Sequence, residues 1–230
     1  PYKEWLKEHR LHLKDLPYTA DYCPIEISDY KTRQRLFNYT LEDIQEIITP
    51  MAIAGKEALG SMGTDTPLAV LSDKPQLISN YFKQLFAQVT NPPLDGIREE
   101  IVTDISLALG KDRNIFSITE RQCRKLRIQN PVISNKDLEK IRNISVDKFK
   151  AETIEILYPK EKGLNGLEDA LDNIIIQITK ALDRDTNIII LSDRGVNKKI
   201  ASILSLLACS FVNHQMNRLR NRSYFDIIIE

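Results

Sequence analysis

The sequence predicts an α/β fold with parallel strands. In the last third of the chain, short runs rich in β-branched residues alternate with longer segments whose apolar residues recur every three or four positions. We expect strands over residues 153–158, 187–191 and 225–229, and helices over 164–182 and 200–220. Helices of this length between strands are typical of parallel βαβ units with right-handed crossovers. With 42% hydrophobic residues, the 230-residue chain can bury one sizeable core or two small ones.

Charge and hydropathy exclude several classes of partner. Lys plus Arg and Asp plus Glu balance at 32 each, so no net field attracts nucleic acid or an anionic membrane surface. The longest apolar runs, such as 203–212, are far shorter than a membrane span, and the N-terminus lacks a signal-peptide core, so we expect a cytoplasmic protein. Cys23, Cys123 and Cys209 are too widely spaced for a disulfide framework, a zinc site or an iron–sulfur cluster. We interpret them as plain thiols.

The first part of the chain differs from the rest. Residues 1–35 are charged and aromatic, and we predict a connector from a preceding domain, whereas residues 36–230 form the α/β domain itself. The chain starts at Pro1 and stops at Glu230 within a strand pattern, which predicts a fragment of a longer polypeptide. His9 and His12 are one helical turn apart, but without a third ligand in reach they indicate surface residues rather than a metal site.

A loop between two glycines is the most unusual stretch of the sequence. A capping-box pattern at residues 40–43 predicts a helix that runs toward Ala58 and delivers the chain to this loop. The loop consists of Gly60, Ser61, Met62, Gly63, Thr64 and Asp65. Both glycines allow positive φ, so the side chains between them are held out from the backbone. The apolar run 68–71 that follows predicts a short buried strand.

Met62 is the side chain of interest in this loop. It has little apolar core to fill there, so contact with a planar flavin or a keto-acid substrate presented by another domain is favoured over core packing. The simpler alternative is a plain turn between a helix and a strand. The loop is too short, and lacks the lysine, to act as a phosphate-binding loop.

Two further helices are predicted over residues 75–90 and 95–110. Pro75 suits a first helical position, and the wide apolar stripe that includes Phe82 predicts burial over much of the first helix. Prolines 92 and 93 end it, and Asp95 caps the second helix, which we expect to end at Gly110.

The middle of the chain is less regular. We expect an extended segment over residues 114–118, a helix over 120–127, and a short helix capped by Ser134 that ends near Asn143. The basic cluster within 121–127 has acidic neighbours, so a solvated or domain-contact surface is favoured over a phosphate site.

The residues Ser192 and Asp193 follow a predicted parallel strand. Loops at the carboxyl ends of such strands line the sites of α/β proteins, so these two residues form a candidate strand-end site. The alternative is a helix-entry loop in which Asp193 and Arg194 form an internal salt bridge. The sequence shows no G-x-S-x-G elbow, no G-x-G-x-x-G turn and no nucleophile–base pair, so we predict no catalytic residues in this chain.

Several motifs together resemble the central domain of the glutamate synthase large subunit. They are Gly60-Ser-Met-Gly-Thr-Asp-Thr-Pro-Leu-Ala-Val-Leu-Ser-Asp73, Tyr81-Phe-Lys-Gln-Leu-Phe-Ala-Gln-Val-Thr-Asn-Pro-Pro93, Gln122-Cys-Arg-Lys-Leu126, Asn130-Pro-Val-Ile133 and Leu191-Ser-Asp-Arg-Gly195. The resemblance implies an α/β domain like a rudimentary FMN barrel without its own cofactor. It also implies a position between a glutaminase domain and an FMN-binding domain.

The resemblance further implies roles for the loop residues. Met62 would face the substrate and FMN pocket of the next domain, and Ser61, Thr64 and Asp65, with the two glycines, would line or gate an ammonia channel. The whole enzyme would carry FMN and an iron–sulfur cluster, neither bound by this chain, and its small-molecule partners would be 2-oxoglutarate and ammonia. Its electron donor would be ferredoxin or a nicotinamide nucleotide, and the plastid stroma is the alternative location. The competing functions are a freestanding flavin- or nucleotide-binding α/β enzyme and a purely structural scaffold domain.

Overall fold

A computed structural model describes residues 2–18, 30–56, 58, 67–83, 93–146 and 148–230. The chain divides into two compact units, the first made of Pro1–Tyr22 with Gln88–Glu230 and the second of Cys23–Ala87.

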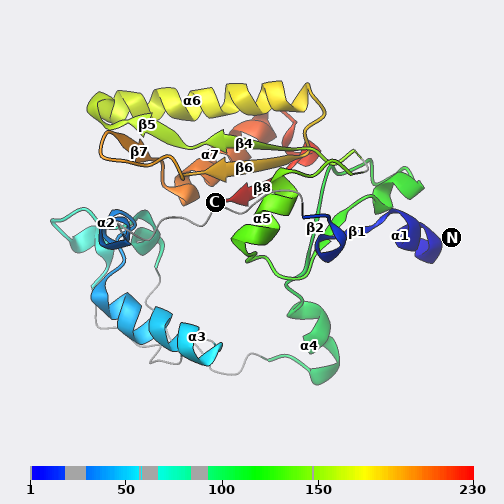
Figure 1. Ribbon diagram of the computed structural model, residues 1–230, viewed down its shortest axis with the longest axis horizontal. Helices are drawn as coiled ribbons and strands as arrows, with labels where there is room; N and C mark the ends of the chain where they lie inside the picture. Colours follow the sequence, from blue (N-terminus) through cyan, green and yellow to red (C-terminus); the bar gives the residue numbers. More distant parts are fainter. Residues whose placement is uncertain (1, 19–29, 57, 59–66, 84–92, 147) are drawn as a thin grey trace. The chain divides into compact units, whose positions relative to one another are not determined.

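A parallel sheet forms the centre of the first unit (Figure 1). Its strands β4 (Ala151–Glu155), β6 (Ile188–Ser192) and β8 (Asp226–Ile229) lie in the order β4-β6-β8, and both neighbouring pairs are parallel. The α/β prediction and the parallel strands are therefore confirmed. Within the described residues this sheet is open, and no closed barrel is formed.

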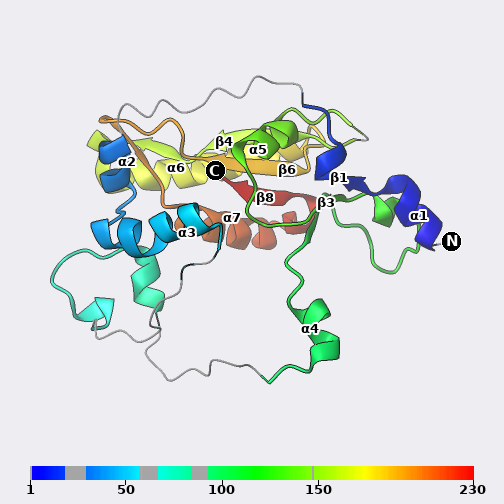
Figure 2. The same cartoon turned by 60° about the horizontal axis from the view of Figure 1, so that its bottom comes forward.

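Strand β6 separates two hydrophobic cores. Because side chains alternate between the faces of a strand, Ile189 and Leu191 belong to one core and Ile188 and Ile190 to the other, and all four are fully buried. Helices α6 (Gly163–Leu182) and α7 (Ser205–Arg218) cover the first face, and α5 (Asn135–Arg142) covers the second (Figures 1 and 2). The helices thus bury both faces of the sheet.

Local signals set the ends of these helices. Ser134 caps α5 as predicted, because its hydroxyl accepts a hydrogen bond from the amide of Asp137 at 3.1 Å. Helix α6 ends through Asp185, which has a left-handed φ of 61°, after which Thr186 donates back to the carbonyl of Ala181 at 3.1 Å. The predicted helices ending near Asn143 and over 164–182 are confirmed.

The predicted helix over 200–220 is wrong in its first residues. Ile200–Ser202 form strand β7, which pairs antiparallel with β5 (Leu157–Pro159). The amide of Ile203 then donates to the carbonyl of Ile156 at 2.7 Å. The backbone groups of residues 200–203 thus pair with Ile156 and β5, which follow β4 in the chain. A helical periodicity in the sequence gives no information about such pairing.

A second, smaller sheet completes the first unit. Strands β1 (Leu11–His12), β3 (Leu126–Ile128) and β2 (Leu107–Leu109) lie in the order β1-β3-β2, with β1 parallel and β2 antiparallel to β3. Helix α1 (Tyr2–His9) precedes β1, and the 3₁₀ turn η1 (Leu13–Asp15) follows it.

This sheet corrects two predicted helices. Asp95 does cap a helix, since its Oδ1 accepts from the amides of Ile97 at 3.1 Å and Arg98 at 2.9 Å. However, α4 is only Gly96–Val102, and the chain then enters β2. The predicted helix over 120–127 is a 3₁₀ turn, η6 (Glu120–Cys123), followed by β3, and residues 114–118 make a turn rather than an extended segment.

The second unit begins with α2 (Tyr30–Leu36) and a helix whose first part is the π-helical segment η3 (Asp43–Ile48) and whose second part is α3 (Thr49–Ala54). The predicted capping box is confirmed: the amide of Thr40 donates to Asp43 at 2.8 Å, and the amide of Asp43 donates to the Thr40 hydroxyl at 3.1 Å. The π-helical turns lie directly before Pro50, which lacks an N–H and crowds the carbonyl one turn earlier.

Two predictions for the second unit are wrong. The run 68–71 is a 3₁₀ turn, η4 (Ala69–Leu71), with Val70 72% exposed, rather than a buried strand. The helix expected from Pro75 is replaced by the 3₁₀ segment η5 (Ile78–Phe82), in which Phe82 is 73% exposed, and residues 84–92 lie outside the described part. None of the described residues of this unit is buried, so its apolar side chains have no core to hold a longer helix or strand.

Candidate functional site at the carboxyl edge of the parallel sheet

The carboxyl ends of the three parallel strands meet at one edge of the sheet. Leu191 of β6 lies opposite Ile229 of β8 in the strand register. The residues that follow, Ser192, Asp193 and Glu230, therefore come together at this edge. It is the edge at which ligands bind in open parallel sheets.

Backbone hydrogen bonds hold this edge in place. The carbonyl of Ser192 accepts from the amide of Ile156 at 2.9 Å. The amide of Asp193 donates to the carbonyl of Glu230 at 3.2 Å, and the amide of Glu230 donates to Leu191 at 2.9 Å. Since these main-chain groups are paired, the side chains at the edge project from a fixed frame.

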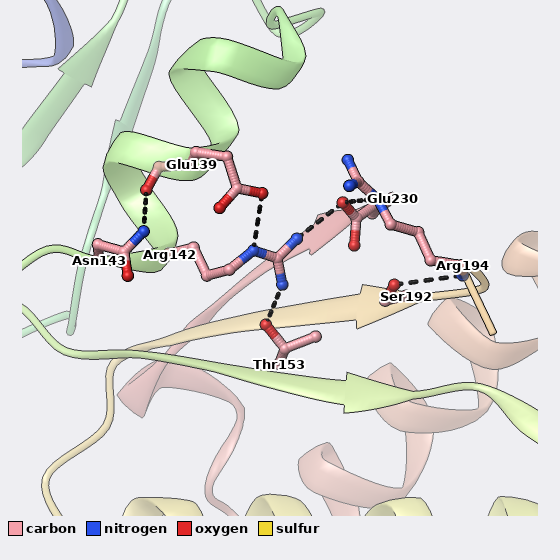
Figure 3. A network of polar contacts seen from close by, with 7 residues as sticks. All are labelled: Glu139, Arg142, Asn143, Thr153, Ser192, Arg194 and Glu230. Carbon is pink, nitrogen blue, oxygen red and sulfur yellow. Dashed lines mark hydrogen bonds and ion pairs between the residues drawn. The ribbon is translucent and has the colours of Figure 1, made fainter. Parts of the chain in front are cut away.

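Arg142, near the C-terminus of α5, connects this edge to the helix (Figure 3). Its Nη2 donates to Oε1 of Glu230 at 2.7 Å, and its Nε donates to Oε1 of Glu139 at 3.1 Å. A third donor, Nη1, reaches the hydroxyl of Thr153 on β4. One guanidinium group thus joins α5, β4 and the end of β8.

A second guanidinium group contacts the same carboxylate. Nε of Arg194 pairs with Oε1 of Glu230, and the amide of Arg194 donates to the hydroxyl of Ser192 at 3.4 Å. The Glu230 side chain is only 7% exposed, so its charge is largely removed from water and depends on its polar neighbours, the two guanidinium groups among them.

The electrostatics follow from this arrangement. Burial disfavours the ionised form of Glu230, but the Ser192 hydroxyl and the guanidinium groups of Arg142 and Arg194 outweigh it, so the pKa of Glu230 is lowered. Burial also disfavours the charged form of Arg142, but Glu230 and Glu139 outweigh it, and the pKa of Arg142 is raised. Glu230 and Arg142 therefore both stay charged near neutral pH.

Chemically, this network is suited to holding the edge together. Two carboxylates face two guanidinium groups, so the charges balance, and a carboxylate with a lowered pKa is a poor general base at neutral pH. Arg194 pairs with Glu230, and the loop after Asp193 leads into strand β7. The loop thus enters a strand, whereas the alternative expected it to enter a helix.

The glycine-flanked loop falls outside the part of the chain that the structure describes. This holds for Gly60, Ser61, Met62, Gly63, Thr64 and Asp65 alike. Their assigned contacts with a substrate, FMN or a channel stay predictions.

Neither a metal site nor a membrane span is found in the part of the chain that the structure describes. No group of three or more His, Cys, Asp or Glu side chains there is arranged to hold a metal ion. His9 instead lies 3.9 Å from a carboxylate oxygen of Glu120. No helix among the described residues is long and apolar enough to cross a bilayer.

Sequence reasoning located Ser192 and Asp193 but missed Arg142 and Glu230. These two residues are 88 positions apart, and no local pattern pairs them. The sequence does contain one indication of this ion pair. Glu230 directly follows the apolar run that forms β8, and a charged residue buried at that position needs an opposite charge nearby.

Comparison with known proteins decides the family. The model of the glutamate synthase central domain matches residues 32–230. The chain belongs to the glutamate synthase central-domain family. Within the glutamate synthases, it is similar to the NADPH-named large chain of Bacillus subtilis, with 39% identity over 100% of this chain and 15% of that protein.

Other glutamate synthases match at similar levels. The NADH-named enzyme of Schizosaccharomyces pombe is 37% identical over 96% of this chain and 11% of its own length. The ferredoxin-dependent chloroplastic enzyme of Spinacia oleracea is 33% identical over 100% of this chain and 14% of its own length. The chain thus spans 11–15% of the length of these relatives, which are named for different electron donors.

Proposed function

We propose that this chain is the part of a glutamate synthase that joins a glutaminase domain to an FMN-binding domain and forms part of the wall of an ammonia channel between them. One observation carries the proposal: the family match runs over residues 32–230, while the chain accounts for only 15% of a relative 39% identical to it. The reaction of the whole enzyme would convert glutamine and 2-oxoglutarate to two molecules of glutamate. We expect it in the cytoplasm, or in the plastid stroma as the name of the spinach relative indicates.

The cofactors of the whole enzyme do not fit the described residues of this chain. Iron–sulfur clusters require several cysteines in one place, but Cys123 lies on η6 and Cys209 on α7, and no cluster of metal-ligating side chains includes either of these described residues. The strand edge that could face a flavin is filled by balanced ion pairs. We therefore assign FMN and the cluster to other domains of the polypeptide, and no reaction step to this chain.

Within this proposal, the loop residues contact the neighbouring active site. Met62 would pack against the substrate and FMN pocket, and Gly60, Ser61, Gly63, Thr64 and Asp65 would shape the channel beside it. The strand-end site would present a rigid surface to an adjoining domain through Asp193, because Ser192 is itself buried and Arg142, Arg194 and Glu230 fix that edge. A channel for ammonia needs small polar groups on a rigid frame that excludes bulk water.

The test is Met62→Ala in the intact enzyme, with Met62→Leu as the conservative control. Glutamine hydrolysis, glutamate formation and free ammonia are measured together with a melting curve. We expect Met62→Ala to lower kcat/KM for glutamate formation and to release ammonia, while Met62→Leu retains most activity and the melting temperature of both stays near that of the wild type. A melting temperature several degrees lower with unchanged kinetics would place Met62 in a core and refute the assigned contact.

A further inference from the structure

A pocket of about 430 Å³ lies in the first unit and shares no lining residue with the strand edge described above. It is bounded by the end of β1 and η1, by the end of β3 and the segment after it, and by one side of α5 from its cap to Lys140. Its volume is in the range of small-molecule sites. None of the predicted functional residues lines it.

Positive charge is concentrated in this cavity. Lys14, Arg127 and Lys140 line it, and Asp137 is the only carboxylate among the described residues that do so. The whole chain has 32 basic and 32 acidic residues, so this local excess of cations is not a general property of the protein.

The three cations retain capacity to bind an anion. Nζ of Lys140 lies 3.0 Å from Asp137, which leaves other donors of the ammonium group to point elsewhere. Arg127 uses one amino group on Asp104, at 3.3 Å, and on Ser106, out of its five donor positions. Lys14 is exposed and has no ion-pair partner within the described residues.

Polar groups beside the cations also present donors. Asn130 also lines the pocket, and its side-chain oxygen accepts from the amide of Val132 at 3.4 Å, a bond that does not use its NH₂ donors. Asp137, the lining carboxylate, shows how these surroundings act on an anion. Burial disfavours its ionised form, but Lys140, Ser134 and Lys136 outweigh burial, so the pKa of Asp137 is lowered.

We propose that this cavity binds a small dianion, either a dicarboxylate or a phosphate group, through Lys14, Arg127 and Lys140. The lining holds three cations and one carboxylate, so two negative charges balance it, and the further carboxylate of Asp104 pairs with Arg127 from outside the lining. The inference stands on the cavity and its charges, and it does not depend on the proposed function.

The experiment measures binding of succinate and of inorganic phosphate to the intact protein by isothermal titration calorimetry. Lys14→Gln removes one charge at an exposed position, so the fold is retained, and Lys180→Gln on α6 is the matched control outside the cavity lining. Melting curves without ligand verify folding. Comparing variants isolates this site from any other dicarboxylate site of the intact protein.

We expect one equivalent of succinate or phosphate to bind about tenfold more weakly in Lys14→Gln, as for a lost charge-assisted hydrogen bond, and unchanged binding in Lys180→Gln. Stronger binding of succinate identifies a dicarboxylate site, and stronger binding of phosphate identifies a phosphate site. Absence of saturable binding of both probes, or equal affinities in the two variants, would overturn the proposal.

Discussion

Gly110→Ala tests how tightly the small sheet is packed on the core around α5. Gly110 follows β2 and has a φ of +122°, which an alanine adopts only with strain. A Cβ at this position would lie 2.9 Å from Cε1 of Phe149, whose ring is buried in the core. The Gly110 backbone cannot easily retreat, because its amide donates to Asp226 at 2.6 Å and its carbonyl accepts from Lys125 at 2.5 Å.

The expected loss of stability is the sum of two effects. A strained backbone conformation costs about 1–3 kcal/mol, and forcing a methyl group against a buried ring costs about 1–3 kcal/mol. Gly110→Ala should therefore lower the free energy of unfolding by about 2–6 kcal/mol. Urea denaturation of the 230-residue chain, followed by circular dichroism, measures this as a lower midpoint at unchanged slope.

Two other glycines separate the two effects. Gly163 has a φ of +53°, and a methyl group added there would meet no heavy atom within 4 Å, so Gly163→Ala should show the backbone cost alone. Gly96 has neither a positive φ nor a neighbour within 4 Å, so Gly96→Ala should change stability by less than about 0.5 kcal/mol. If Gly110→Ala costs no more than Gly163→Ala, the argument from the Phe149 contact is refuted.

Three further predictions concern the sheet edge, the sheet core and the second unit, and the same denaturation assay tests them. Arg142→Met should cost about 1–3 kcal/mol near neutral pH, less than for a fully buried pair because Arg142 is 24% exposed and Glu230 keeps its second partner. The lowered pKa of Glu230 adds stability that is fully present above the ordinary glutamate pKa of 4.5 and is lost as the pH falls through the lowered pKa. This loss of stability on acidification should be smaller in Arg142→Met. An unchanged dependence of stability on pH in the variant would contradict the ion-pair assignment. Ile190→Ala should lower the free energy of unfolding by about 2–5 kcal/mol because the Ile190 side chain is fully buried. Ile176 on α6 is 52% exposed, so Ile176→Ala should cost far less. Equal losses in the two variants would argue against the core assignment. Phe82→Ala should cost less than about 1 kcal/mol, since the ring is exposed, and a loss above about 3 kcal/mol would show that the ring is buried.

The last third of the fold could be predicted because its patterns are complete within the sequence. Helix α6 has an apolar stripe over five turns, and the run that forms β6 is apolar on both faces, as expected for a strand covered on both sides. The run 68–71 is just as apolar but short, and periodicity cannot state whether another element covers it. The structure shows a 3₁₀ turn there.

The candidate site could be predicted in position but not in chemistry. The rule for parallel strands correctly places Ser192 and Asp193 at the carboxyl edge of the sheet. The ion-paired residues at that edge include Arg142 on α5 and Glu230 at the end of β8. Their pairing depends on how α5 and β8 pack in the folded chain, which the sequence does not reveal. Arg142 in particular has the appearance of an ordinary surface arginine near a helix end.

The double-sided burial of β6 links the stability of the two cores. Truncating a side chain on one face lets the backbone of β6 shift, and the side chains on the opposite face must then repack. The losses of unfolding free energy from substitutions on the two faces should therefore be coupled rather than additive. Local opening of either core must release the same strand. Both cores therefore hold the strand that ends at Ser192, and a domain docked at this edge would rest on backbone whose opening disrupts both of them.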